Sequence, residues 1–373
     1  MSNISQMLEE FNNIEIIRKT ISKLTQPEVF VMVWYKDLER ALSHYLTTPS
    51  KITFIIPDYY KYQSEIESLD KRIIPIESIT KKQDIVVYAS PSTTPWKGES
   101  LYRLLYLCHE NHFSTYIDKE AISLLWKKPT ISDFFDKHIS AINVIYTALN
   151  DENSKNTYLR AIKAICTGDS GYLNLSNYQQ YFHPKCKAEY GEHIIEGGID
   201  NGVTTKKFAD LCGDNGYVVA FEPLARAFIE SKENCKNYTN IIFENFALSS
   251  SEDIFYIEDK GGGSRISKDN TRGNLIHSID IDTYTKNHNN ISCSLIKLDI
   301  EGSEMACLTG AINTIKKYRP KLQISLYHNP SDYIDIPLFI MQHCKNYDFF
   351  VGHHSFWFNE TILYATPHEL IVG

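Results

Sequence analysis

Short apolar runs alternate with stretches of helical periodicity over residues 26–128. Buried parallel strands read as short apolar runs, and the helices between them place apolar residues every three or four positions. The alternation therefore predicts a small parallel α/β domain. An amphipathic helix is expected before it, over residues 1–25. The strands are expected at Val29–Trp34, Ile52–Ile56 and Ile85–Ala89, and the helices at Leu38–Tyr45, Tyr59–Leu69 and Glu99–His112.

The first strand-to-helix turn of this domain, Trp34–Asp37, contains no glycine. A pyrophosphate needs the close backbone approach that glycine permits, so we expect an accessory or scaffolding domain rather than a dinucleotide-binding one. Residues 129–190 follow as a mostly helical connector, in which Tyr158, Leu159 and Ile162 share one apolar face.

A second alternation of strands and helices fills residues 191–373. Its last two strands are close enough in sequence to form an antiparallel hairpin, so the fold class is α/β with a parallel sheet that ends in a hairpin. Strands are expected at His193–Ile195, Val218–Phe221, Ile241–Phe243, Leu295–Leu298, Leu322–Leu326, Asp348–Val351 and Thr361–Tyr364. Helices are expected at Thr204–Cys212, Leu224–Asn234, Ser303–Lys317 and Ile336–Cys344.

A glycine turn follows the first strand of this second domain, with the spacing E-x-G-x-x-x-G over Glu196–Gly202. Glycines at 198 and 202 let the backbone turn sharply and bring amide N–H groups against a ligand at a helix start. Ligands of open α/β sheets bind beyond the carboxyl ends of the strands, so Glu196, Gly198, Asn201 and Gly202 are expected to bind a nucleoside cofactor. An ordinary glycine turn is the alternative.

Glu222 stands at the end of the second strand. A carboxylate in that position can accept both ribose hydroxyls of a bound nucleoside, as in nicotinamide and adenosylmethionine sites. A solvated glutamate before Pro223 is the alternative. Asn245 and Ala247 follow the third strand, where an adenine ring is usually held by a side chain and nearby backbone.

Charged and apolar residues alternate through the fourth strand, in the stretch that carries Lys297, Asp299 and Glu301. A strand covered on both faces is normally apolar throughout, and unpaired buried charges are costly. We therefore expect these side chains to open into a polar cleft at the strand end. A purely structural Lys297–Asp299 pair is the alternative.

Three histidines in the C-terminal part of the chain are expected near the same edge of the sheet. His328 ends the fifth strand, and His353 and His354 lie at the hairpin loop. Histidine takes up a proton near neutral pH, although a single histidine is more often structural.

Composition adds limits on partners and compartment. The formal net charge is −8, which argues against a broad nucleic-acid-binding surface. The 8 cysteines contain no C-x-x-C pair, so free thiols in a reducing cytosol are expected. The N-terminus has no signal-peptide pattern and no apolar run is long enough to span a membrane, which predicts a cytoplasmic protein.

A parallel sheet that ends in an antiparallel hairpin is the layout of class I methyltransferases, whereas nicotinamide-binding sheets continue parallel. Residues 151–367 resemble the FkbM-type methyltransferases of this class, an S-adenosylmethionine-dependent family that methylates hydroxyls of sugars and polyketide-like compounds. This chain departs from the usual pattern with Glu196 in place of Asp and Ile199-Asp200 in place of Ala-Asn. The matching stretches are Glu196–Gly202, Ala220–Pro223, Asn245–Leu248, Lys297–Glu304 and Glu360–Ala365.

The resemblance implies S-adenosylmethionine as the cofactor and a saccharide or another small-molecule acceptor. Gly262–Arg265 resembles the substrate loop of the family, so Ser264 and Arg265 are expected to bind substrate. Glu301 and His353 are expected to do the same from the sheet edge. Asp299 is expected beside the cofactor, and the candidate catalytic bases are Asp299, His328 and His354.

Three questions stay open at this point. A divalent ion held by Asp299 and Glu301 would lower the pKa of the acceptor hydroxyl, but a site without metal is favoured. A nicotinamide-dependent oxidoreductase and a non-catalytic cofactor-binding interaction module are the alternative functions. A monomer and a homo-oligomer are both compatible with the sequence.

Overall fold

The computed structural model describes residues 28–35, 38–44, 51–69, 72–79, 84–88, 104, 107–108, 110–111, 114–117, 131–167, 170–257, 266–267, 273–288 and 291–372. The helix expected over residues 1–25 and the loop with Ser264 and Arg265 lie outside these residues, as does most of the expected helix Glu99–His112. The chain divides into two compact units. The first comprises residues 1–143, 159–174 and 355–358, and the second residues 144–158, 175–354 and 359–373.

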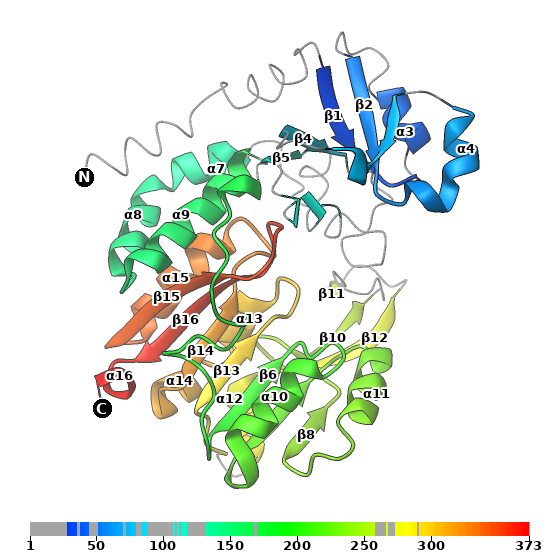
Figure 1. Cartoon of the computed structure of the whole chain (residues 1–373). Helices are drawn as coiled ribbons and strands as arrows, with labels where there is room; N and C mark the ends of the chain where they lie inside the picture. The colour runs from blue at the N-terminus through cyan, green and yellow to red at the C-terminus, as the bar shows by residue number, and fades with distance from the viewer. Residues whose placement is uncertain are drawn as a thin grey trace. The chain divides into compact units, whose positions relative to one another are not determined.

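The first unit contains a five-stranded sheet with the order β3-β2-β1-β4-β5, in which every neighbouring pair is parallel. This is the α/β pattern expected from the sequence, drawn in blue to cyan in Figure 1. Two short strands, β3 and β5, were not predicted. The elements are β1 (Glu28–Met32), α3 (Leu38–His44), β2 (Lys51–Ile56), α4 (Gln63–Glu67), β3 (Ile73–Pro75), β4 (Asp84–Val87) and β5 (Ser114–Ile117).

The second unit is built on a seven-stranded sheet with the order β15-β16-β14-β13-β6-β7-β8. Figure 1 shows this order as the change of colour from red through yellow to green across the sheet. Strand β16 is antiparallel to both β14 and β15, and the other neighbours are parallel. The strands are β6 (His193–Gly197), β7 (Tyr217–Phe221), β8 (Ile241–Glu244), β13 (Leu295–Leu298), β14 (Lys321–Ser325), β15 (Tyr347–His353) and β16 (Thr361–Pro367).

The helices of this unit follow the expected alternation with one break. The single helix expected over Ser303–Lys317 is two helices, with Gly310 as the C-cap of the first and Ala311 as the N-cap of the second. A Cβ at position 310 would lie 2.6 Å from the Ser249 carbonyl oxygen. The helices are α10 (Val203–Cys212), α11 (Ala225–Asn234), α12 (Ile281–Asn287), α13 (Glu304–Thr309), α14 (Ile312–Tyr318), α15 (Asp332–His343) and α16 (Glu369–Val372).

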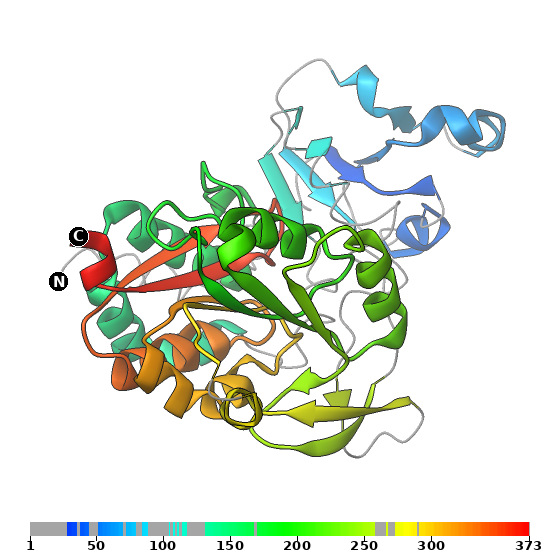
Figure 2. The ribbon, with the colours of Figure 1, turned by 90° about the horizontal axis from the view of Figure 1, so that it is seen from below.

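A second, four-stranded sheet lies between β8 and α12 in the sequence and was not predicted. Its order is β11-β10-β12-β9, with β10 and β12 forming an antiparallel pair. Figure 2 shows these two strands in yellow-green at the lower edge of the view. The strands are β9 (Ala247–Leu248), β10 (Asp253–Ile257), β11 (Ile266–Ser267) and β12 (Asn274–Ile279).

The expected connector is helical only in its first part. Three helices, α7 (Ile131–Lys137), α8 (Ile139–Ala148) and α9 (Glu152–Thr167), are followed by a short 3-10 turn at Ser170–Tyr172. The described residues from there to β6 then run without a helix or strand. This irregular run matters for the site because it brings Tyr181 to Asp299, 118 positions away in sequence.

Candidate active site

The glycine turn after β6 is held against the ends of both neighbouring strands. The Gly198 N–H donates to the Phe221 carbonyl of β7 at 3.1 Å. Gly198 has a φ of 76°, and a Cβ there would lie 1.8 Å from the Asp299 carbonyl oxygen. At Gly202, with a φ of 78°, a Cβ would lie 2.8 Å from the Cys235 sulfur. Both positions therefore require glycine.

A buried ion pair lies directly beneath this turn. Glu196 of β6 is opposite Lys297 of β13, and the Lys297 Nζ lies 3.7 Å from the Glu196 Oε1. Lys297 also donates to the Gly197 carbonyl at 3.3 Å and to the Gly198 carbonyl. Burial raises the pKa of Glu196, and the charge of Lys297 opposes this rise. The ammonium group therefore ties the glycine turn to the strand below it.

This pair changes two expectations. Glu196 is 0% exposed, so it supports the glycine turn and does not face a ligand, although a cofactor contact was expected. Lys297 is 2% exposed and does not open into a cleft, because it pairs with Glu196. Asp299 and Glu301 do reach the surface, with side chains 24% and 36% exposed.

Glu222 lies beside the glycine turn, at the end of β7. Its Oε1 accepts from the Leu224 backbone N–H at 2.9 Å. Burial raises the pKa of Glu222 to about 7, and hydrogen bonds from the backbone at Leu224 and Ile199 limit the rise. The carboxyl group is thus desolvated and would gain further donors from a bound ligand.

The two residues expected at an adenine ring have other contacts. The Asn245 side-chain amide donates to the Glu222 carbonyl at 2.7 Å and to the Pro223 carbonyl at 3.2 Å, so Asn245 supports the turn that carries Glu222. Ala247 is 4% exposed within β9 and presents no side-chain surface. The Asn201 Oδ1 accepts from the Val203 N–H at 3.2 Å, at the start of α10.

Asp299 accepts three hydroxyl hydrogen bonds, none of which was predicted. Tyr181 donates to Oδ2 at 2.8 Å, and Ser325 and Tyr327 donate to Oδ1 at 3.0 and 2.7 Å. Burial alone would raise the pKa of Asp299. The charges of Lys297 and His328 and the tyrosine donors instead hold it below its usual value. Asp299 is therefore a carboxylate at neutral pH.

His328 is a cation surrounded by carboxylates. Its Nδ1 lies 2.9 Å from Glu304, and its Nε2 lies 3.5 Å from both Asp299 and Glu301. Burial lowers the pKa of His328, but these three carboxylates outweigh it and raise the pKa to about 10. A protonated imidazole cannot accept a proton, so the geometry does not favour His328 as the base.

The same cluster is where a metal ion would find ligands. The donor atoms of Asp299, Glu304 and His328 all lie within 4.8 Å of one another. His328, however, already occupies the centre of the cluster as a cation, and both oxygens of Asp299 accept hydroxyl groups. A divalent ion would have to displace these contacts, so the donor set fits an imidazolium better than a metal.

The hairpin histidines are paired with hydroxyl groups of β16. The His353 Nδ1 lies 2.8 Å from the Thr361 hydroxyl, and the side chain is 0% exposed, so His353 does not face a substrate as expected. The His354 Nε2 lies 2.9 Å from the Tyr364 hydroxyl. Burial lowers the pKa of His354 to about 4. His354 therefore remains a neutral hydrogen-bonding group over the neutral range.

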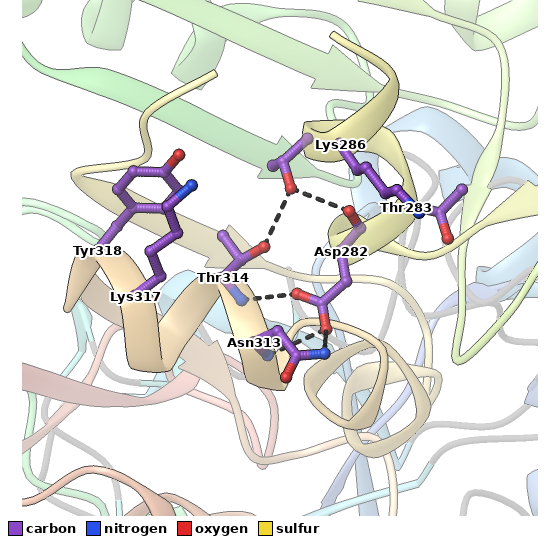
Figure 3. Close-up of a pocket in the computed structure, with 8 residues that line it drawn as sticks. Asp282, Thr283, Lys286, Asn313, Thr314, Lys317 and Tyr318 are labelled. Atoms are coloured by element: carbon purple, nitrogen blue, oxygen red, sulfur yellow. Dashed lines mark hydrogen bonds between the residues drawn. The ribbon is translucent and has the colours of Figure 1, made fainter. Parts of the chain in front are cut away.

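Two pockets lie away from these residues. One, of about 270 Å³, lies between α12 and α14 and is drawn in Figure 3. Its centre is Asp282, which accepts from the Asn313 N–H at 3.0 Å and the Thr314 N–H at 2.6 Å and so caps α14. The other, of about 610 Å³, is lined by Glu244, Tyr284 and His288 among others. Neither includes Glu222 or Asp299.

The comparisons agree with this fold. A family model described as the methyltransferase FkbM domain matches residues 189–351. The chain is similar to the crystal structure of the FkbM methyltransferase of Methylobacillus flagellatus KT, with a TM-score of 0.63, 16% identity and 98% of each chain covered. A search of the curated proteins found no match.

Two further solved structures are similar over about half of the chain. Fibrillarin of Aeropyrum pernix, solved with S-adenosyl-L-methionine, has a TM-score of 0.32 and 11% identity over 48% of this chain and 67% of its own. An rRNA methylase of Streptococcus thermophilus has a TM-score of 0.34 and 12% identity over 51% of this chain and 97% of its own.

Among the described residues, no helix is both long and apolar enough to cross a membrane. The α/β fold class predicted from the sequence is confirmed by the match over the full chain. The methyltransferase expectation is likewise supported over the nicotinamide-dependent alternative. Residues 189–351 match the methyltransferase FkbM domain, and the chain is an S-adenosylmethionine-dependent methyltransferase.

Proposed function

We propose that this methyltransferase transfers a methyl group to a hydroxyl of a saccharide or similar small molecule. The observation that carries the proposal is the direct contact between the Gly198 turn and the Asp299 backbone. The turn expected to hold the methyl donor and the carboxylate expected to meet the acceptor are thereby fixed side by side. Positioning of the two reactants supplies much of the rate in such a displacement.

The donor would be held by Gly198, Gly202 and Glu222. The two glycines allow amide groups to approach a ligand at the start of α10, and the desolvated carboxyl group of Glu222 offers acceptors for two ribose hydroxyls. When bound, S-adenosylmethionine supplies a methyl group on a positively charged sulfonium. The residues present therefore fit this cofactor.

The acceptor would meet a negatively charged and hydroxyl-rich surface. Asp299 stays ionised, and Glu301 is half-buried beside it with its carboxylate 3.5 Å from His328. Polar groups of this kind suit a polyhydroxylated acceptor, and the family resemblance points to the same class. Ser264 and Arg265 remain proposed substrate contacts on the loop outside the described residues.

The cell compartment is part of the proposal. All eight cysteines are free thiols, and seven of them are buried. Free thiols are typical of a reducing compartment, which supports a cytoplasmic location.

The direct test is a screen of the purified full chain against sugars and nucleotide-sugars, with release of S-adenosylhomocysteine as the readout. We expect release above the acceptor-free background with at least one saccharide, and loss of that release in Asp299→Asn. Release only with acceptors that carry no sugar hydroxyl would overturn the proposed substrate class while leaving the methyltransferase assignment intact.

A further inference from the structure

Glu360 stands at the edge of the sheet where the proposed active site lies. It directly precedes β16, and the pairing of Ile362 with Ser325 sets the start of β16 beside the end of β14. Its φ is 64°, a left-handed conformation that is uncommon for a residue with a side chain. The Glu360 carbonyl accepts from the His354 N–H at 3.0 Å, which fixes this turn. Backbone in this region is often found at functional sites.

A chain of hydrogen bonds connects Glu360 to Asp299. The Gln180 side-chain amide donates to the Glu360 Oε2 and to the Tyr181 hydroxyl, the latter at 3.1 Å. Tyr181 in turn donates to the Asp299 Oδ2 at 2.8 Å. The Asn359 amide donates to the other oxygen of Glu360 at 3.0 Å. Two carboxyl groups are thus oriented by one network of neutral donors.

The surroundings push the pKa values of these two carboxyl groups apart. Burial, followed by the charge of Asp299, raises the pKa of Glu360 to about 7, against the hydrogen bond from Gln180 and the charges of His328 and Lys297. The pKa of Asp299 is held low by its own cations and donors. When the pKa values of two neighbouring carboxyl groups differ in this way, one group commonly stays charged and the other exchanges protons.

We propose that Glu360 is the general base that takes the proton of the acceptor hydroxyl, with Gln180 as its positioning residue. This inference rests on the proposed function above. As the acceptor oxygen bonds to the methyl carbon, the carbon–sulfur bond breaks and its electron pair stays on sulfur. The hydroxyl proton moves to the Glu360 carboxylate. The positive charge of the sulfonium and the negative charge of the base disappear together, and Glu360 later releases the proton to solvent.

The ionisable groups around Glu360 come from several elements. Lys297 lies in β13 and Asp299 directly follows it. His328 and Tyr327 follow β14, and Tyr181 lies on the irregular run before β6. The tyrosines have pKa values raised well above the usual range by burial, and they remain neutral. Between about pH 6 and about pH 8, Glu360 is therefore the group of this set that titrates.

Two measurements on the full chain test the proposal, each with Glu360→Gln, Glu360→Asp and the exposed control Glu230→Gln. The first needs no acceptor: an infrared titration of the carboxyl band. Glu222 also titrates near neutral pH, so we expect the carboxyl signal that titrates there to be the same in the wild type and in Glu230→Gln, and to be smaller by one carboxyl group in Glu360→Gln. Titration unchanged by Glu360→Gln would overturn the proposal.

The second measurement is single-turnover methyl transfer across pH, with S-adenosylmethionine affinity measured in parallel. The wild-type rate should rise through about pH 7 as Glu360 loses its proton. Glu360→Gln should lose that rise and about 10²–10⁴ in rate, Glu360→Asp should recover part of the rate, and affinity should change little. Near wild-type turnover in Glu360→Gln would overturn the proposal. A wild-type chain that binds S-adenosylmethionine but methylates no hydroxyl would instead count against the proposed function. The infrared titration would still show whether the Glu360 carboxyl group titrates near neutral pH.

Discussion

Lys297 and Glu196 form a buried ion pair across the neighbouring strands β13 and β6, with Nζ 3.7 Å from Oε1 and both side chains almost fully buried. The same ammonium group donates to the carbonyls of Gly197 and Gly198. A buried pair of this kind is weak evidence for stability by itself, because desolvation offsets the attraction. Here it has a clear structural consequence, since it anchors the turn proposed to bind the cofactor.

Removal of one partner of this ion pair should lower the free energy of unfolding. Lys297→Met leaves the Glu196 carboxylate buried without its counter-charge, and we expect the free energy of unfolding to fall by about 3–5 kcal/mol. The double variant Lys297→Met with Glu196→Leu removes both charges and should recover a large part of this loss. Urea unfolding of the three proteins measures both effects. A double variant as unstable as the single one would contradict the pairing.

Gly198→Ala should disrupt the cofactor turn, because the added carbon would lie 1.8 Å from the Asp299 carbonyl oxygen. Gly191→Ala is the matched control: its φ is 80°, similar to that of Gly198, but a Cβ there meets nothing within 4 Å. The control should therefore show only the left-handed backbone penalty of about 1–2 kcal/mol. We expect a larger loss of stability and a loss of S-adenosylmethionine affinity in Gly198→Ala alone. Equal effects of the two substitutions would argue against the close approach.

Asp299→Asn keeps the shape of the side chain and removes its charge. If Asp299 orients the acceptor and raises the pKa of Glu360, methyl transfer should slow by about 10²–10⁴, while cofactor affinity changes little. The rise of the rate with pH should also move to lower pH, because Glu360 loses a neighbouring negative charge. Single-turnover rates across pH measure both effects. A pH profile in the same position as that of the wild type would show that the two carboxyl groups are not coupled.

His328 should make the stability of the second unit fall in alkaline solution. Its folded-state pKa of about 10 lies above the ordinary 6.5, so its contribution is complete below about pH 6.5 and is lost as pH rises through about 10. His328→Gln should be less stable near neutral pH and should show a weaker decline. His368→Gln, at a side chain 56% exposed, is the control. Urea unfolding at several pH values checks this, and parallel declines in all three proteins would contradict it.

Much of the second domain could be predicted because its signals are local. Leu295–Leu298 was predicted with the bounds that the structure gives, and α10 ends at Cys212 as expected. The small sheet of β9 to β12 was missed, because two of its strands are only two residues long and carry no periodic pattern. The hydroxyl groups around Asp299 were missed for a different reason. Tyr181 contacts Asp299 only through the tertiary fold, and the sequence around neither residue indicates this contact.

S-adenosylmethionine is proposed to bind at the carboxyl ends of β6 and β7, with its ribose hydroxyls on Glu222. Calorimetric titration of the wild type and Glu222→Ala with S-adenosylmethionine tests it most directly. Loss of charge-assisted hydrogen bonds should weaken binding by about 1.5–3 kcal/mol, or roughly 10-fold to 150-fold in Kd. Equal affinity of the two proteins would contradict this placement of the cofactor.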